Sequence, residues 1–298
     1  MHVPILVDAI LELLEIAPDH IVLDGTGGYG GHSSAMLEKL GPQGRLYITD
    51  RDPMAVDCLN ARFSDDARVS VCPMTYADFV THVGTVSEND KNVVFPKRVD
   101  RLLVDLGMSS MQLDDPDRGF GYLHDGSVDM RMNPDDPISA SEVLNTYSAQ
   151  DLSDIFFRYG ELHQNKILVQ NIIAFRKHTK ISETSQLRDL IKASYHFGKR
   201  PIMMRHFAQV FQALRILVNR EFEELETLVA MLDRTLASDG RVAFLTFHSQ
   251  EDRLVKHGMR EHKSWRMVTK HVVLASQDEL RDNSRAKAAK LRVYQRVV

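Results

Sequence analysis

Five glycines fall within seven residues near the start of the chain, and this cluster constrains the fold more than any other feature. It lies in Asp24-Gly25-Thr26-Gly27-Gly28-Tyr29-Gly30-Gly31-His32-Ser33, between an apolar segment at 21–23 and a helical pattern at 34–40. Strand, glycine-rich turn and helix in this order are typical of the first unit of a nucleotide-binding α/β sheet. Glycines let the backbone turn sharply and approach a ligand where a Cβ atom would clash.

The acid that precedes the glycines narrows the class of ligand. A dinucleotide site sets a pyrophosphate over the helix N-terminus, and the Asp24 carboxylate would repel that group. The carboxylate suits a ligand with a free amino group, such as the methionine part of S-adenosylmethionine. Asp50 ends the next apolar segment, twenty residues beyond Gly30, at the spacing where a carboxylate binds ribose hydroxyls. Together the two acids favour an adenosyl ligand, although the motif alone also fits a turn without a ligand.

The apolar segments predict a Rossmann-like α/β fold with a seven-stranded sheet. Ligands bind beyond the carboxyl ends of strands in open α/β sheets, so Asp24, Asp50 and Asp105 should converge there. Asp52 and Pro53 should begin a helix that ends near Phe63, as N-cap and first residue. One long amphipathic helix is expected over 211–236. The expected strands are 21–23, 44–50, 68–73, 99–107, 241–247, 266–273 and 291–298.

The alternation of strands and helices stops between residues 111 and 204. Residues 111–137 are rich in Asp, Pro and Gly, and helical patterns follow at 140–146, 151–159, 165–176 and 184–194. We interpret 111–204 as an inserted, mostly helical domain. Residues 1–110 and 205–298 would form the nucleotide-binding domain. An ordinary crossover with long loops is the alternative, and it fits usual loop lengths poorly.

Composition and charge limit the compartment and the partners. The chain has 298 residues, of which 43% are hydrophobic and 26% charged, as in soluble globular proteins. We see no signal peptide and no apolar run of the roughly 20 residues that a membrane span needs. Cys58 and Cys72 are expected to be free thiols in a reducing, cytoplasmic compartment. The histidine spacings match no zinc motif, so no catalytic metal is expected.

The net charge of −4 does not indicate a nucleic-acid partner, but the distribution of charge matters more. Residues 281–298 contain six basic residues and one acid. Such a tail suits RNA phosphates, and it also fits a merely solvated face.

Motifs along nearly the whole chain resemble those of the RsmH (MraW) methyltransferases. This family methylates the exocyclic N4 of a decoding-centre cytidine in 16S ribosomal RNA, within the small ribosomal subunit, using S-adenosylmethionine. The matching segments are 2–4, 24–33, 50–53, 105–107 with 109–110, 112–114, 118–120, 129–132, 160–161, 211–216 with 219, 247–249, 251–253 and 288–292.

The resemblance implies a class I methyltransferase sheet interrupted by a helical domain that helps to bind RNA. Tyr76 holds the position after the third strand where an aromatic residue, usually Phe, lies near the cofactor. Whether such a protein is a monomer or a homodimer stays open. The other cofactor contacts that the resemblance implies are Gly30, Gly31, His32, Asp50, Asp105 and Gln112.

The reaction needs a positioned amine and an acceptor for its protons. Cytosine N4 is a poor nucleophile because its lone pair is delocalised into the ring, so the site must hold it in line with the methyl sulfonium. Asp105, or the hydroxyls and carbonyls of Ser109 and Ser110, would accept from the amine, unless Asp105 binds the cofactor alone. His248 is a candidate base, or a group that orients the substrate.

The candidates for RNA binding are guanidinium or ammonium groups for phosphates and an aromatic ring for a splayed base. Phe120 fits equally well as a core residue of the insert. Two other functions stay open: an NAD-dependent oxidoreductase, disfavoured by Asp24, and a catalytically silent RNA-binding assembly factor. The residues predicted to contact RNA are Arg118, Phe120, Arg131, Ser249, Lys290 and Arg292.

Overall fold

The computed structural model describes residues 4–85, 94–195 and 200–297, with the backbone alone for residues 110 and 200–203. The chain divides into two compact units. The first comprises Met1–Gly107 and Phe222–Val298, and the second comprises Met108–Glu221. Each unit has its own apolar core.

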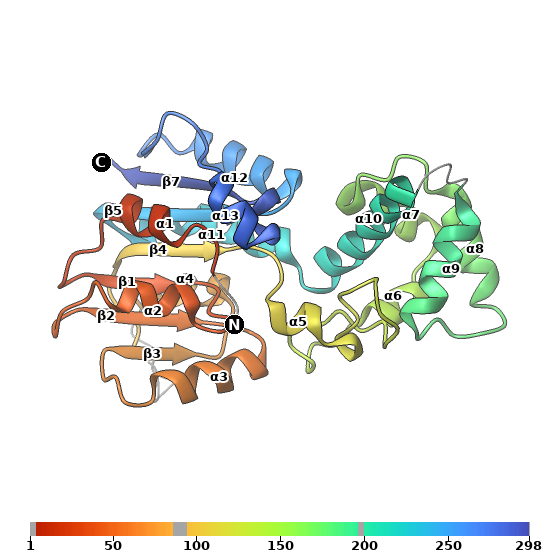
Figure 1. Cartoon of the computed structure of the whole chain (residues 1–298), viewed down its shortest axis with the longest axis horizontal. Helices are drawn as coiled ribbons and strands as arrows, with labels where there is room; N and C mark the ends of the chain where they lie inside the picture. Colours follow the sequence, from red (N-terminus) through yellow and green to blue (C-terminus); the bar gives the residue numbers. More distant parts are fainter. Residues whose placement is uncertain (1–3, 86–93, 196–199, 298) are drawn as a thin grey trace. The chain divides into compact units, whose positions relative to one another are not determined.

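The first unit is built on one seven-stranded sheet, in the order β3-β2-β1-β4-β5-β7-β6 (Figure 1). Strands β1 to β5 run parallel to one another, whereas β7 runs antiparallel to both β5 and β6. The predicted α/β fold with seven strands is confirmed. The strands are β1 (Ile21–Asp24), β2 (Arg45–Thr49), β3 (Val69–Cys72), β4 (Val99–Asp105), β5 (Leu236–Thr246), β6 (Trp265–Met267) and β7 (Lys290–Arg296).

Helices cover both faces of this sheet, which explains the continuous apolar runs at 21–23, 102–104 and 242–245 in its central strands. One face packs in a cluster with α1 (Val7–Leu14), α2 (Gly31–Leu37), α3 (Pro53–Phe63), α13 (Gln277–Asp282) and the short helix η2 (Ser284–Ala288). The other packs with α4 (Tyr76–His82), α11 (Glu221–Thr235) and α12 (Ser249–Glu261). Asp52 caps α3 and Pro53 is its first residue, as predicted.

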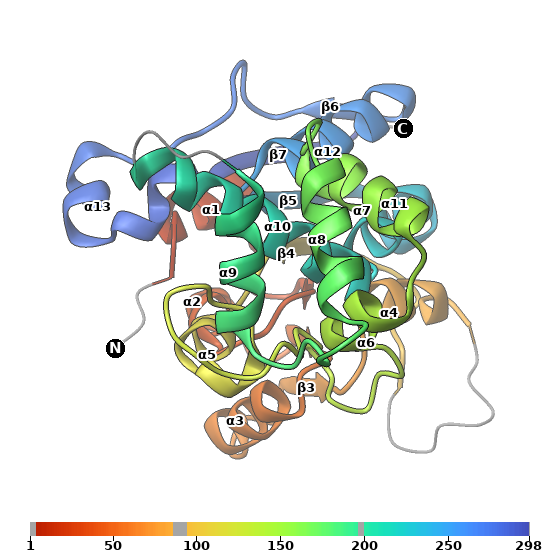
Figure 2. The same ribbon diagram turned by 90° about the vertical axis from the view of Figure 1, so that its right-hand side faces the viewer.

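The second unit is mostly helical, and its core is centred on Phe156, Val210 and Phe211. In Figures 1 and 2, α8 and α9 lie side by side. Its elements are α5 (Ser110–Asp114), η1 (Pro116–Arg118), α6 (Ala140–Thr146), α7 (Ala149–Gly160), α8 (Lys166–Phe175), α9 (Thr184–Ser194) and α10 (Arg200–Val218).

Three predicted boundaries differ from the structure. The helix expected over 211–236 is two helices, α10 and α11, because Arg220 adopts a left-handed φ of 53° and breaks the ladder. The insert extends past residue 204 to Glu221, because Phe207 to Val218 pack into its core. Strand β6 is three residues long rather than eight, and beyond it only an isolated bridge joins Val273 to Leu291.

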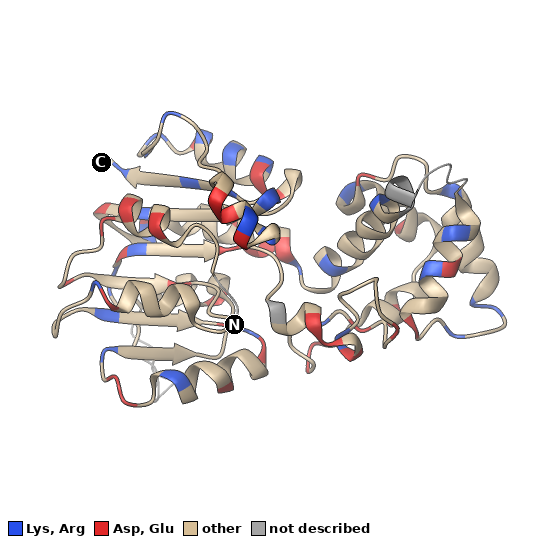
Figure 3. Cartoon of the chain, viewed as in Figure 1, with Lys and Arg blue, Asp and Glu red and all other residues tan. Residues whose placement is uncertain are grey.

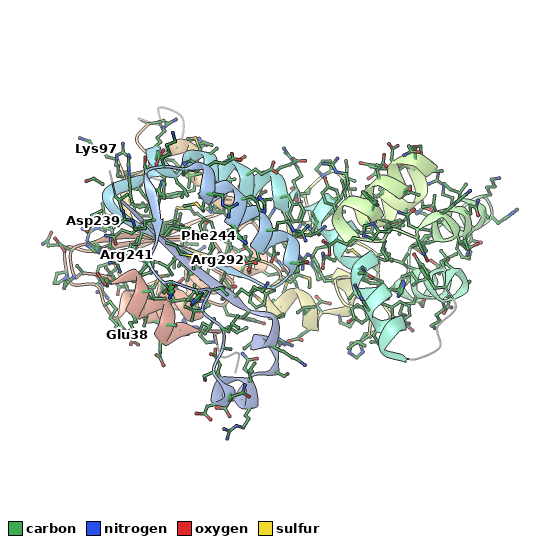
Figure 4. All side chains as sticks on the ribbon, turned by 90° about the horizontal axis from the view of Figure 1, so that it is seen from above. Glu38, Lys97, Asp239, Arg241, Phe244 and Arg292 are labelled. Atoms are coloured by element: carbon green, nitrogen blue, oxygen red, sulfur yellow. The ribbon has the colours of Figure 1, made fainter. Side chains whose placement is uncertain are left out.

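The two edges of the sheet have different chemistry. At the edge where the parallel strands begin, Arg101 and Arg241 donate to the Leu14 and Leu13 carbonyls that end α1. Figure 4 shows Arg241 beside Asp239 at this end of the sheet. These two arginines therefore stabilise the end of a helix. The candidate site lies at the opposite edge, where the parallel strands end, and this edge is called here the carboxyl edge. No helix among the described residues is long and apolar enough to cross a membrane.

Candidate functional site

The Asp24 side chain holds the glycine loop together through hydrogen bonds from the interior of the protein. Its side chain is fully buried, accepts the Ser33 hydroxyl at 2.5 Å and accepts the Thr26 amide at 3.2 Å. Burial raises the pKa of Asp24 to about 6, and the Ser33 hydrogen bond opposes that rise. Asp24 therefore fixes the start of α2. Its contact with the amino group of a ligand stays a prediction.

Packing and backbone conformation require glycine at two positions of the loop. A Cβ atom on Gly27 would lie 2.6 Å from both Ile48 Cγ2 and Leu59 Cδ1. Gly30 has a φ of 75° and precedes the first residue of α2, Gly31. The loop thus depends on glycine because its own neighbours fill the space and because the chain turns left-handed before the helix.

Asp50 follows β2 and joins that strand to the loop. One oxygen accepts the Gly28 amide at 2.8 Å, and the other accepts the Asp52 amide at 2.9 Å. Burial raises the pKa of Asp50, although the two amides oppose the rise. A carboxylate oxygen has a second lone pair, so these oxygens can also accept ribose hydroxyls.

Asp105 ends β4, and its backbone amide donates to Thr26 Oγ1 in the loop at 2.8 Å. Its carboxylate is 28% exposed and lies 3.5 Å from Nδ1 of the buried His32, the second residue of α2. Burial, and after it the charge of Glu251, raises the pKa of Asp105 to about 7. An acceptor that titrates near neutral pH is therefore present at the carboxyl edge.

His248 begins α12 two residues beyond β5. Its Nδ1 accepts the Glu251 amide at 3.4 Å, and its Nε2 lies 2.8 Å from Glu251 Oε1. Of the two ring nitrogens, Nδ1 accepts a hydrogen bond from the first turn of α12, whereas the buried Nε2 lies beside the Glu251 carboxylate without a hydrogen bond in the described part of the chain. The geometry favours a capping and orienting role for His248 over that of a general base.

Tyr76 is the first residue of α4, and 7% of its surface is exposed. It lies against the loop, because a Cβ atom added to Gly25 would be 3.0 Å from Tyr76 Cβ. The structure therefore brings six predicted residues together within the first unit, with Asp24 beneath them. They are Gly30, Gly31, His32, Asp50, Tyr76 and Asp105.

Two other predicted residues form a helix cap in the second unit. Ser109 Oγ accepts the Gln112 amide at 3.4 Å, and Gln112 Oε1 accepts the Ser109 amide at 3.1 Å. Gln112 is only 4% exposed. The side chain of Ser110 lies outside the described part of the chain. Their proposed roles at the cofactor or the amine stay predictions.

The residues of the insert that were predicted to contact RNA are engaged within it. Phe120 is 3% exposed and belongs to the core, so its ring is not available for stacking on a base. Arg131 pairs with Asp129 at 2.7 Å. Arg118 donates to the carbonyls of Arg131 and Met132. Phe120 is therefore a core residue of the insert, which was the alternative prediction for it.

The predicted cations of β7 are also paired. Arg292 Nε donates to Asp252 Oδ1 at 2.8 Å, and Lys290 Nζ lies 3.3 Å from Asp252 Oδ2. Figure 4 places the labelled Arg292 near Phe244, its partner in the sheet. Ser249 is the first residue of α12 and is exposed. Lys290 and Arg292 thus tie β7 to α12, beside the carboxyl edge.

Sequence reasoning gave no role at the site to three residues that hold it together. The Thr26 hydroxyl oxygen accepts a hydrogen bond from the Asp105 amide, and the Ser33 hydroxyl donates one to the Asp24 carboxylate. Glu251 is 2% exposed, accepts the Phe247 amide at 2.9 Å and influences the pKa of Asp105. A sequence signal for Glu251 existed, because an acid three residues after a helix cap is the spacing of a capping box.

Comparison with known proteins gives full-length matches. The model of the MraW methylase family matches residues 1–297. The chain is 39% identical over 320 residues to ribosomal RNA small subunit methyltransferase H of Solidesulfovibrio magneticus, covering 100% of this chain and 96% of that protein. It is 35% identical over 312 residues to the protein of the same name from Coxiella burnetii, covering 99% of each.

Proposed function

The chain belongs to the MraW methylase family, and we propose that it is an S-adenosylmethionine-dependent methyltransferase that modifies N4 of a decoding-centre cytidine in 16S ribosomal RNA. The observation that carries the proposal is the convergence of Asp50, Asp105 and the glycine loop at the carboxyl edge. The names of the relatives support ribosomal RNA of the small subunit as the substrate.

The donor set at this edge fits S-adenosylmethionine better than a pyrophosphate ligand. Residues 24–33 contain no Lys or Arg, and the nearby guanidinium of Arg62 donates to the Tyr29 carbonyl of the loop. Asp50 would hold the ribose hydroxyls, and Tyr76 would lie beside the adenosyl group. A compound with two phosphates would meet Asp50 and Asp105 without a neutralising cation from the loop.

The bound cofactor would supply an electrophilic methyl group. Asp105 would accept a hydrogen bond from the attacking amine, and its carboxyl group lies beside the His32 ring. A pKa of about 7 keeps a substantial fraction of Asp105 ionised at neutral pH. His248 would fix the start of α12 at the substrate side through Glu251. The insert would contribute to RNA binding as a separate unit.

Titration calorimetry tests the cofactor. Saturable binding of S-adenosylmethionine without binding of NAD is expected, and the reverse result would favour an oxidoreductase. Transfer of a tritiated methyl group to small subunits that lack the modification tests the reaction. A protein that binds both the cofactor and the subunit without transfer would instead be an assembly factor.

A further inference from the structure

One face of α12 carries a row of exposed basic residues that neither the sheet nor the cofactor site uses. Arg253, Lys256, His257 and Arg260 recur at helical spacing, and Lys263 follows just beyond the end of the helix. All five side chains are exposed. Figure 3 shows Lys and Arg recurring along this helix. We refer to these five residues as the α12 row.

The opposite face of α12 is fixed in the protein. Val255 and Met259 are 0% and 2% exposed and belong to the core that covers the sheet. The i, i+3, i+4 and i+7 spacing places the row on the side that faces away from this core. The row is therefore a fixed surface of the first unit, not a mobile tail.

Three cations of the row have no acidic partner among the described residues. The side chains of Lys256, Arg260 and Lys263 have no hydrogen bond or ion pair within the described residues. Other cations of the first unit do have acidic partners, as in Arg51 with Glu224 and Arg68 with Asp66. The row thus concentrates positive charge on a protein whose net charge is −4.

The acid nearest to the start of the row is already neutralised. Asp252 contacts both Lys290 and Arg292, which sets one carboxylate against two cations. Two groups beside the carboxyl edge thereby remove a charge that would repel a polyanion. The α12 helix starts at this edge and carries the row away from it.

We infer that the α12 row binds phosphates of the substrate RNA on one side of the target base, as a second contact surface in addition to the insert. From Arg253 to Arg260 the helix rises about 10 Å, which spans several charges of an RNA strand. Exposed Lys and Arg without acidic partners are the side chains that contact a nucleic-acid backbone without reading its sequence. This inference rests on the proposed function.

An anionic membrane surface is a less suitable partner. A membrane-bound helix inserts its apolar face into the lipid. In α12 that face is occupied by the protein's own core through Val255 and Met259. The charge is therefore available without the apolar anchor that membrane binding uses.

The test removes three charges from the row in the full-length protein, as Lys256→Gln, Arg260→Gln and Lys263→Gln together. The matched control is Lys39→Gln, Arg45→Gln and Lys97→Gln, three cations exposed elsewhere on the same unit. Binding to small subunits that lack the modification is measured between 50 and 200 mM salt. We expect the row variant to bind about tenfold or more weakly, with a salt slope smaller in magnitude by about 2.

Two further readings separate the outcomes. Turnover at saturating subunit concentration and affinity for S-adenosylmethionine should match those of the wild-type protein, since the row lies outside the cofactor site. Equal losses in the row variant and the control, or an unchanged slope in the row variant, would overturn the inference. Loss of binding to anionic vesicles with unchanged RNA binding would assign the row to a membrane instead. Failure of the wild-type protein to methylate any subunit would count against the proposed function, while the binding data would still decide the inference.

Discussion

His32 Nδ1 lies 3.5 Å from Asp105 Oδ2, and the other nitrogen of the same ring lies 2.9 Å from the Ile5 carbonyl oxygen. A carbonyl only accepts, so Nε2 carries a hydrogen. In the neutral ring Nδ1 then carries no hydrogen and faces the Asp105 carboxyl group. The contact between Nδ1 and Asp105 is attractive only when a proton lies on one of these two groups. A pKa of about 7 for Asp105 places that proton on its carboxyl group in part of the population at neutral pH.

The first prediction concerns turnover and pH. If ionised Asp105 accepts from the amine, the methylation rate should rise with pH and level off above about 7. The Asp105→Asn variant should lose at least about 10²-fold in rate, the typical contribution of a positioned acid or base, and its residual rate should lack this rise. Single-turnover rates from pH 5.5 to 9 measure both. A variant with the wild-type rate and wild-type cofactor affinity would exclude both roles of Asp105.

The same group predicts how stability depends on pH. The pKa of Asp105 is raised above its usual 3.8, so the folded state favours the protonated form. Stability from this group is greatest below the unfolded pKa and falls as pH rises toward 7. Asp105→Asn should therefore gain on the wild-type protein by about 2 kcal/mol between pH 5 and pH 8. Urea unfolding at both pH values measures the difference, and an equal difference at the two values would contradict the prediction.

The loop predicts a steric effect at Gly27. A Cβ atom there would meet Ile48 and Leu59 at 2.6 Å, so Gly27→Ala should destabilise the fold by about 1–3 kcal/mol. Gly121→Ala is the control, because the nearest atom to its added Cβ lies 3.6 Å away. Thermal unfolding compares the two variants. Equal melting temperatures would mean that the loop shifts to accommodate a side chain.

The buried ring of Phe120 separates packing from RNA binding. Phe120→Ala should cost about 3–5 kcal/mol of stability, because the ring fills the core of the insert. Phe157→Ala, at a position 51% exposed, should change stability little. Denaturant unfolding tests both. Unchanged stability in Phe120→Ala with weakened RNA binding would restore the stacking role.

His248 gives a test that distinguishes capping from base catalysis. Asn is a good helix cap but cannot act as a base, so His248→Asn should keep both stability and turnover. His248→Ala should lose about 1 kcal/mol of stability. A fall in turnover by about 10² or more in the Asn variant, with stability retained, would make His248 the base.

Local patterns were sufficient to predict the seven strands of the sheet. Buried parallel strands carry continuous apolar runs, and the positions of the acids Asp50 and Asp105 at strand ends follow directly from the ends of these runs. The break after α10 could not be predicted in the same way. Apolar spacing continues across it, and the Asn219 side chain there binds the Met130 carbonyl, which is distant in sequence.

The direction of polar side chains was also beyond sequence reasoning. Asp24 and Phe120 have the right residue types for ligand contact, yet long-range packing buries both. Arg292 has the right charge for RNA, but β7 places it against Asp252. The α12 row was not predicted because its basic residues are three or four positions apart in the sequence and do not form a continuous basic run.

The most direct test is the identity of the methylated nucleoside. Small subunits that lack the modification are incubated with tritiated S-adenosylmethionine and either the wild-type protein or Asp50→Ala. Their RNA is then digested to nucleosides and separated. We predict that the label migrates with N4-methylated cytidine, and that Asp50→Ala requires much more cofactor to reach the same level. Label on another atom or base, or none with intact wild-type protein, would contradict the account.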